Sequence, residues 1–344
     1  MAIDEPAGRG PTAATSPLSC AMRGIAWRDG VVEDESVSLE ELAGLAHDPS
    51  RLLWIDLVDP GRADMAILAD NLGLPPTTVE DVLAPHERPK LVRASDHEFF
   101  MTYAVRLDAR ESPERLVTSR VSGLVLPHAL VTIRADDTFD IEEVVRRWNE
   151  DPALLSHGTG ALLHGLLDTV VDEHFDTIQE LDDAVEDLED TLFEGGRTTH
   201  DFVRRIYGLR KDLVRLRRVV LPMREVVNGV LRHRSDEDPH LARLYDDLYD
   251  HVLRAAEWTE SLRDMVTTLF ETNLSLQDIQ LNQVMRKLAA WAAIIAVPTA
   301  VTGWFGQNIP YLGFQEPLGV WLSGLLIAGG SGGLWVLFRR LGWL

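Results

Sequence analysis

The sequence predicts an α+β membrane protein in which a cytosolic α/β domain precedes a long helical stalk with a coiled-coil hairpin and two C-terminal transmembrane helices. Three observations predict this fold. Short β-like and helical runs alternate from residue 21 to about 155. A helical pattern without Gly or Pro begins near His240 and continues to Pro298. Two apolar spans, 288–305 and 318–338, contain no ionisable residue.

The net charge of −22 argues against nucleic acid as a partner, because duplex binding is driven by Lys and Arg side chains that neutralise phosphates. Cations fit this balance better. The first 20 residues lack the basic start and the apolar stretch of a secretory signal, so we expect a disordered cytosolic tail. The predicted segments are the tail at 1–20, the α/β domain at 21–155, the hairpin and stalk at 156–287, the first membrane helix at 288–306, an external loop at 307–317, the second membrane helix at 318–338 and a cytosolic end at 339–344.

Within the α/β domain, runs rich in β-branched and aromatic residues predict strands, and two runs predict helices. The strands are Met22–Trp27, Leu52–Leu57, Phe99–Leu107, Val121–Leu126 and Leu130–Arg134, and the helices are Thr77–Leu83 and Ile141–Trp148. Pro127-His128-Ala129 is expected to join the last two strands as a hairpin. The chain has no glycine-rich phosphate loop, HExxH or nucleophile elbow. Because no acid, base and nucleophile set converges either, an enzyme is not expected.

The next segment predicts a helical hairpin of opposite charges. Apolar residues recur every three or four positions in 168–194, as in a coiled-coil seam. The rest of that helix is acidic and has no Lys or Arg, whereas the helix after Gly195-Gly196 is basic. Two interpretations stay open for the carboxylates: they are solvated charges that stabilise the pair, or some of them attract divalent cations. The helix that begins near His240 would span about 85–90 Å and enter the membrane as one rod.

The two apolar spans are each long enough to cross a bilayer as a helix. A buried helical hairpin in a soluble protein is the alternative. Arg286 and Lys287 precede the first span, Arg339 and Arg340 follow the second, and the loop between the spans offers only Glu316. The positive-inside rule therefore places both ends of the chain in the cytoplasm.

Two helices are too few to enclose an aqueous path, so a conducting pore requires several copies of the chain. One face of the first membrane helix and the end of the stalk is small or polar. It comprises Leu274, Asp278, Asn282, Met285, Leu288 or Ala289, Ala292, Ala296, Thr299 and Gly303. This face suits a close-packed interface that also lines a channel. Plain helix packing through small residues is the alternative. Pro298 is expected to remove one backbone hydrogen bond and to kink the helix.

Four stretches, together with this order of segments, resemble the CorA family of divalent metal ion transporters, and the resemblance covers nearly the whole chain after residue 20. They are WIDLVDPG at 54–61, TTVEDVLAPHERPKL at 77–91, LLHGLLDTVVDEHF at 162–175 and NQVMRKLAAWAAIIAVPTAVTGWFGQN at 282–308. The family signature Gly-Met-Asn is here Gly306-Gln307-Asn308. The resemblance implies a homopentameric funnel in the inner (plasma) membrane, with Mg²⁺ as substrate and regulatory ligand and no prosthetic group. Co²⁺ or Ni²⁺ is often accepted, and the ZntB branch handles Zn²⁺, so Gln307 leaves the ion open.

The signature residues are expected to form the ion entry. Mg²⁺ dehydrates reluctantly, so a ring of Asn308 carbonyls that accepts hydrogen bonds from its waters strips nothing from the ion. Gly306 would let the backbones approach the axis. Gln307 either widens this polar funnel or faces a neighbouring subunit.

The resemblance also assigns the remaining site residues. The lower polar ring falls on Asn282, the hydrophobic constriction on Met285 and Leu288, and the mid-membrane hydroxyl on Thr299; Ala292 and Gly303 share their face. Asp246, Asp247 and Asp250 are candidates for one side of a regulatory metal site, or else a solvated helix face. Glu316 either concentrates cations at the outer mouth or only aids solubility.

Three functions are therefore compared. The first is a passive Mg²⁺ channel gated by cytosolic metal, and the second is Zn²⁺ transport coupled to protons. The third belongs to another class: a membrane-anchored sensor or scaffold whose apolar hairpin only tethers the cytosolic domain.

Overall fold

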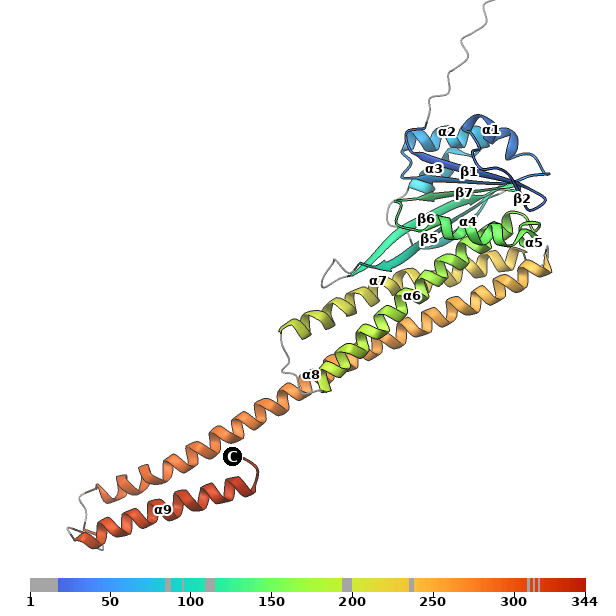
Figure 1. Ribbon diagram of the computed structural model, residues 1–344. Helices are drawn as coiled ribbons and strands as arrows, with labels where there is room; N and C mark the ends of the chain where they lie inside the picture. The colour runs from blue at the N-terminus through green and yellow to red at the C-terminus, as the bar shows by residue number, and fades with distance from the viewer. Residues whose placement is uncertain are drawn as a thin grey trace, which may run out of the picture. The chain divides into compact units, whose positions relative to one another are not determined.

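The computed structural model describes residues 18–83, 88–94, 96–108, 115–193, 200–234, 238–307, 310–311, 313–314 and 316–344 (Figure 1). Its contacts group the chain into two compact units. The larger comprises Met1–Glu194 with His200–Val266, and the smaller comprises Gly195–Thr199 with Thr267–Leu344.

The larger unit is built on a mixed sheet whose strand order is β2-β1-β3-β7-β6-β5-β4. The strands are β1 (Ala21–Arg28), β2 (Val31–Asp34), β3 (Leu52–Val58), β4 (Lys90–Arg93), β5 (Glu98–Leu107), β6 (Leu116–Val125) and β7 (Ala129–Arg134). Strands β3 and β7 run parallel, and the other neighbours run antiparallel. Leu126 N–H donates to Ala129 O at 2.8 Å between β6 and β7, which confirms the predicted hairpin.

Helices cover both faces of this sheet. The helices of the chain are α1 (Leu39–Leu45), α2 (Arg62–Leu72), α3 (Pro76–Leu83), α4 (Ile141–Glu150), α5 (Pro152–Leu155), α6 (Thr159–Phe193), α7 (His200–Arg234), α8 (Pro239–Phe305) and α9 (Pro317–Arg340). Figure 1 shows α1 to α3 on one side of the sheet, and α4 with the long helices α6 and α7 on the other. Each side has its own buried apolar cluster. Residues of α8 up to Val252 belong to the cluster on the side of α4, α6 and α7.

The structure confirms the predicted strands and helices and adds elements that the pattern did not predict, among them the edge strands β2 and β4 and the helices α1 and α2. Strand β6 also begins five residues before its predicted start at Val121. Helix α6 begins at Thr159 and contains the apolar seam predicted in 168–194. The single long helix is confirmed, because α8 runs without interruption from Pro239 to Phe305.

Helix α6 is fastened to the sheet by side chains that bond to backbone carbonyls of β5. His174 Nε2 lies 2.8 Å from Tyr103 O, and Thr177 donates to Val105 O at 3.1 Å. Nearby, an added Cβ on Gly165 would lie 2.6 Å from Nε1 of Trp148, so only glycine allows α4 this close to α6. The two hydrogen bonds hold α6 against the sheet, and the close approach at Gly165 holds α4 against α6.

A second polar contact anchors α7. The carboxylate of Asp212, fully buried, accepts the backbone N–H groups of Arg115 at 3.0 Å and Leu116 at 3.2 Å. Arg115 directly precedes β6, and Leu116 is the first residue of that strand. The carboxylate thus satisfies buried backbone donors, which would otherwise cost free energy.

Burial of His174 makes the stability of the larger unit depend on pH. Burial lowers the pKa of His174 from its ordinary value of 6.5 to about 4. Below pH 6.5 the unfolded chain therefore binds a proton that the folded chain does not, so stability falls as the pH drops from 6.5 towards 4. The full loss is about 3 kcal/mol. Thermal unfolding of the full chain, followed by tryptophan fluorescence, should show this decline.

The His174→Gln variant is the matched control, because its amide can still donate to Tyr103 O but does not titrate. Its midpoint should change less than that of the unchanged chain over the same pH range. Parallel pH profiles for the two proteins would refute the assignment.

Candidate ion pathway

The smaller unit contains two helices that are long and apolar enough to cross a membrane, the C-terminal part of α8 and the whole of α9. Only 6% of the most apolar window of α8 and 0% of that of α9 are buried within the chain. Helices that formed the core of a soluble domain would be covered by their own chain. The exposed apolar surface therefore favours a lipid-spanning hairpin over the buried one.

The two membrane helices meet at a proline. Pro298 has no backbone N–H, so the carbonyl of Ile294, four residues earlier, loses its helical donor. Ser331 of α9 supplies a hydroxyl to that oxygen at 3.4 Å. Beside it, a Cβ on Gly330 would lie 2.8 Å from Cγ1 of Val297, so glycine permits the close approach. In lipid no water could satisfy the freed carbonyl, and the hydroxyl of α9 does so instead.

Helix α9 covers one side of α8 and leaves the opposite side bare. Ala290 is buried, and Ile294 and Val297, on the same side, contact α9. Thr299 follows Ala290 by nine residues and so lies on the opposite side, at about 100° per residue. The predicted pore face from Met285 through Leu288 and Ala292 to Gly303 shares this bare side and is exposed, and Asn282 at its N-terminal end is exposed too.

The bare face changes in character along α8. Asn282, Met285 and Leu288 are exposed, the last two by 59% and 60%. Further along, Thr299 donates its hydroxyl proton to Ile295 O at 3.0 Å, which leaves its oxygen as an acceptor. The face thus presents an amide, then two large apolar side chains, then a hydroxyl oxygen.

Helix α8 ends just before the signature residues. Gly306 N–H donates to Thr302 O at 2.9 Å, and Gln307 N–H donates to Trp304 O at 3.4 Å. A Cβ on Gly306 would lie 3.0 Å from Thr302 O, so a larger residue would disturb this last turn. Gln307 is exposed, and Asn308 lies outside the described residues.

An aromatic cluster ties the end of α8 to the start of α9. The ring of Tyr311 lies 4.8 Å from that of Phe305 and 5.3 Å from that of Phe314. Gly313 has a φ of +85°, and a Cβ on Gly319 would lie 2.6 Å from its carbonyl oxygen. Glycines at both positions therefore let the loop close tightly. Glu316, at the N-cap of α9, is exposed.

The candidate regulatory patch lies on the part of α8 that belongs to the larger unit. Asp246, Asp247 and Asp250 are all exposed. Asp247 Oδ2 approaches Nε2 of His251 at 3.7 Å. Among the described residues of one chain, no three His, Cys, Asp or Glu side chains converge to hold a metal ion. A metal bound at this patch would therefore need further ligands from another source.

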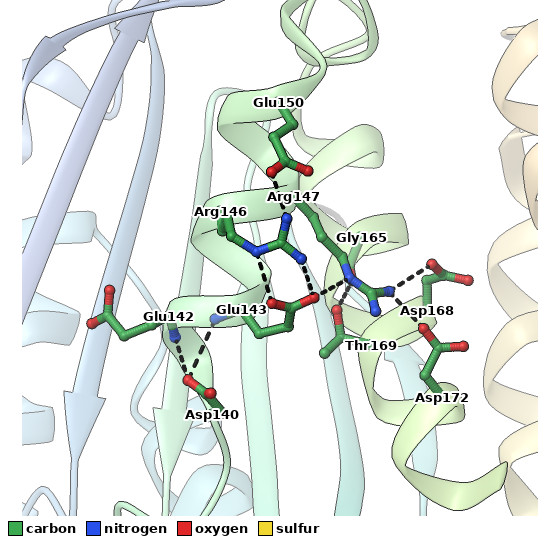
Figure 2. Close-up of polar contacts among 10 residues, drawn as sticks. All are labelled: Asp140, Glu142, Glu143, Arg146, Arg147, Glu150, Gly165, Asp168, Thr169 and Asp172. Carbon is green, nitrogen blue, oxygen red and sulfur yellow. Dashed lines mark hydrogen bonds and ion pairs between the residues drawn. The ribbon is translucent and has the colours of Figure 1, made fainter. Parts of the chain in front are cut away.

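Part of the acidic helix α6 is already neutralised by an arginine that the sequence pattern did not reveal (Figure 2). Nη1 of Arg147, on α4, lies 2.7 Å from Asp172 and 3.2 Å from Asp168, while its Nε lies 2.9 Å from Glu143. Burial raises the pKa of Asp168, and the charge of Asp172 raises it further. Since the guanidinium occupies both carboxylates, this pair is not a free site for a cation.

Two contacts clamp the head of α8 to α6, and neither was predicted. Tyr245 donates its hydroxyl to Gly160 O at 2.8 Å. His164 Nε2 lies 3.3 Å from Leu244 O, and its ring meets that of Tyr245 edge to face at 5.2 Å. The segment that carries the acidic patch is thus held by α6.

The model of a family described as CorA-like Mg²⁺ transporter protein matches residues 49–340. The cobalt/magnesium transport protein CorA of Thermotoga maritima is 29% identical over 273 residues, which cover 77% of this chain and 75% of that protein. The zinc transport protein ZntB of Yersinia enterocolitica is 27% identical over 266 residues, 74% of this chain and 76% of that protein. The complete structure of the CorA magnesium transporter from Methanocaldococcus jannaschii matches with a TM-score of 0.75 and 25% identity, covering 93% of this chain and 98% of that one.

The Ser331 contact yields a prediction about the membrane hairpin. Ser331→Ala leaves the carbonyl of Ile294 without its hydroxyl donor, and we expect a loss of about 0.5–1.5 kcal/mol in stability. Unfolding of the full chain by sodium dodecyl sulfate in mixed micelles measures it. Ser323→Ala is the matched control, because Ser323 bonds to Val320 O of its own helix. Equal effects of the two substitutions would show that the interhelical bond contributes nothing.

Proposed function

Because the chain belongs to the CorA family and is thus a divalent cation transporter, we propose that it conducts Mg²⁺ into the cell through a pore formed by five copies of itself. The observation that carries this proposal is the bare face of α8. In the described part of the chain α9 covers the opposite side, while this face, with the hydroxyl of Thr299 and the amide of Asn282 at its N-terminal end, is exposed. If several copies of α8 surround a common axis, this face contacts water in the pore and the neighbouring copies of α8 instead of lipid.

The entry of the pore selects by contact with the hydration shell. Mg²⁺ keeps its waters strongly, and a ring of Asn308 carbonyls accepts hydrogen bonds from them without displacing any. Neutral amides bind the hydrated ion weakly enough for release, whereas a carboxylate ring would retain it longer. Gly306 supports this arrangement, because a Cβ there would lie only 3.0 Å from Thr302 O and would crowd the last turn. Glu316 raises the local cation concentration at the outer mouth.

The membrane potential drives the ion. Moving one charge across 100 mV is worth about 2.3 kcal/mol, and a divalent ion gains twice that. Coupling to a second ion is therefore unnecessary for uptake. In this proposal both termini lie in the cytoplasm and the signature residues lie outside the inner membrane, an orientation that the basic residues flanking the two spans favour.

Met285 and Leu288 form the gate in this proposal. Apolar side chains that meet on an axis exclude water and so block ions. Both stand on the same continuous helix as Asp246, Asp247 and Asp250. Metal bound between these carboxylates and a neighbouring subunit would hold the helices in the closed arrangement, and loss of cytosolic Mg²⁺ would release them.

Zn²⁺ transport coupled to protons is the second candidate, and two observations favour it. Gln307 replaces the methionine of the signature, and a relative that covers most of this chain is named a zinc transport protein. A sensor or scaffold, by contrast, would carry no ion flux at all.

Ion flux into proteoliposomes tests the proposal. With an inside-negative potential and no pH gradient, we expect Mg²⁺ uptake by the unchanged chain. Asn308→Ala should reduce it by about tenfold or more, because the ring loses its carbonyl acceptors. Gln315→Ala also removes a side-chain amide from the predicted loop at 307–317, but outside the signature, and should leave uptake near its original rate.

Two results would contradict the Mg²⁺ proposal. Uptake that prefers Zn²⁺ and appears only with a proton gradient would establish the second candidate instead. Uptake that is unaffected by Asn308→Ala would remove the proposed entry site.

A further inference from the structure

We propose that the larger unit binds a nucleoside phosphate in a cleft between α7, the first part of α8 and the segment before β4. The cleft has a volume of about 420 Å³. It lies within one unit of the chain and shares no residue with the proposed ion pathway.

The cleft lies beside Pro222 and Gly229 of the continuous helix α7. Pro222 lies inside α7 and removes one of its backbone hydrogen bonds. About two turns later, a Cβ on Gly229 would lie 2.8 Å from Leu91, so β4 packs directly on α7 at this glycine. The cleft opens beside this contact, with Pro222 and Leu221 in its wall.

Polar groups without partners face this cleft. Arg88, Arg224, Asn228 and Tyr249 line it, and none of them bonds to another residue that the structure describes. Arg147, by contrast, is held by the carboxylates of Asp168 and Asp172. The cleft therefore offers two guanidinium groups, an amide and a phenol to a ligand.

The charge balance of the lining selects an anion. Glu225 is the single carboxylate among the lining residues, against the two arginines. Guanidinium groups bind phosphate through two parallel hydrogen bonds, a geometry that fits phosphate oxygens particularly well. The amide of Asn228 and the hydroxyl of Tyr249 add neutral donors to the same space.

The size and the apolar wall point to more than a bare phosphate ion. A volume of about 420 Å³ lies in the range of sites for small organic ligands. Leu221, Pro222 and the half-buried ring of Tyr249 supply a surface on which a planar base can lie. A nucleoside phosphate combines both features, an anionic group for the arginines and a flat ring for the apolar wall.

Occupation of the cleft would act on the stalk helix directly. Tyr249 belongs to α8 and directly precedes Asp250 of the acidic patch. A ligand that contacts Tyr249 therefore touches the turn of α8 that also carries the candidate regulatory carboxylates. The ligand class would then be a cytosolic regulator of the transporter.

Isothermal titration calorimetry on the full chain in lipid nanodiscs tests the assignment, with ATP as the probe and EDTA present to remove divalent cations. We expect saturable binding at one site per chain. Arg88→Gln and Arg224→Gln should each weaken binding by about tenfold or more, because each removes a guanidinium group that can form two parallel hydrogen bonds to phosphate. Arg232→Gln, a neutralisation on the same helix outside the cleft lining, should leave binding unchanged. Arg224→Lys keeps the charge but loses the fork, so we expect an intermediate affinity.

The base is tested separately. Tyr249→Leu should weaken the binding of ATP more than that of inorganic phosphate, because only ATP has a ring to stack. The proposal is overturned if ATP shows no saturable binding, or if both arginine variants bind as the unchanged chain does. Inorganic phosphate that binds as tightly as ATP would overturn the nucleoside assignment.

Discussion

A membrane helix with a polar face must bury that face against something other than lipid. The smaller unit meets this constraint only in part. Helix α9 packs on one side of α8 and even supplies the hydroxyl of Ser331 to the carbonyl freed by Pro298. The opposite side, with Thr299 and Gly303, is left exposed by the residues that the structure describes. An assembly of several chains in which this side lines a water-filled axis satisfies the constraint. The proposed function depends on such an assembly.

The continuity of α8 connects the two ends of the proposed mechanism. One helix carries both the clamp to α6 at Tyr245 and the apolar residues Met285 and Leu288. Helical hydrogen bonds make such an element stiff, so a change at its head can be transmitted along its length. The neutralised pair Asp168 and Asp172 narrows the search for regulatory metal ligands, because Arg147 already holds both.

Local patterns in the sequence were sufficient for most of the fold. Alternating β-branched and aromatic residues predicted β1, β3, β5, β6 and β7, whereas β2 and β4 are four-residue edge strands with half-exposed patterns and give little signal. Helix α2 could have been found, since Met65, Leu68, Ala69 and Leu72 follow helical spacing and Gly73 ends the helix. The first residues of α6 show no helical period, because they are buried on every side.

The candidate site likewise has some features that a local sequence pattern predicts and others that it does not. Helical spacing alone places Leu288, Ala292, Thr299 and Gly303 on one face. The bond between Ser331 and Ile294 depends on the register of two helices, which no local pattern gives. The contact of Arg147 with the acidic helix joins residues more than 20 positions apart for the same reason. Unpaired polar groups around the cleft of the larger unit likewise become visible only in three dimensions.

Water access to the bare face of α8 tests the central claim most directly. In a Cys20→Ser background, Thr299→Cys and Leu325→Cys are each treated with a charged, membrane-impermeant thiol reagent while Mg²⁺ flux is recorded. Leu325 is 70% exposed on α9, where lipid is expected. The account predicts that the cysteine at 299 reacts and that flux stops, while the cysteine at 325 stays unmodified. Protection of position 299 together with undisturbed flux would contradict it.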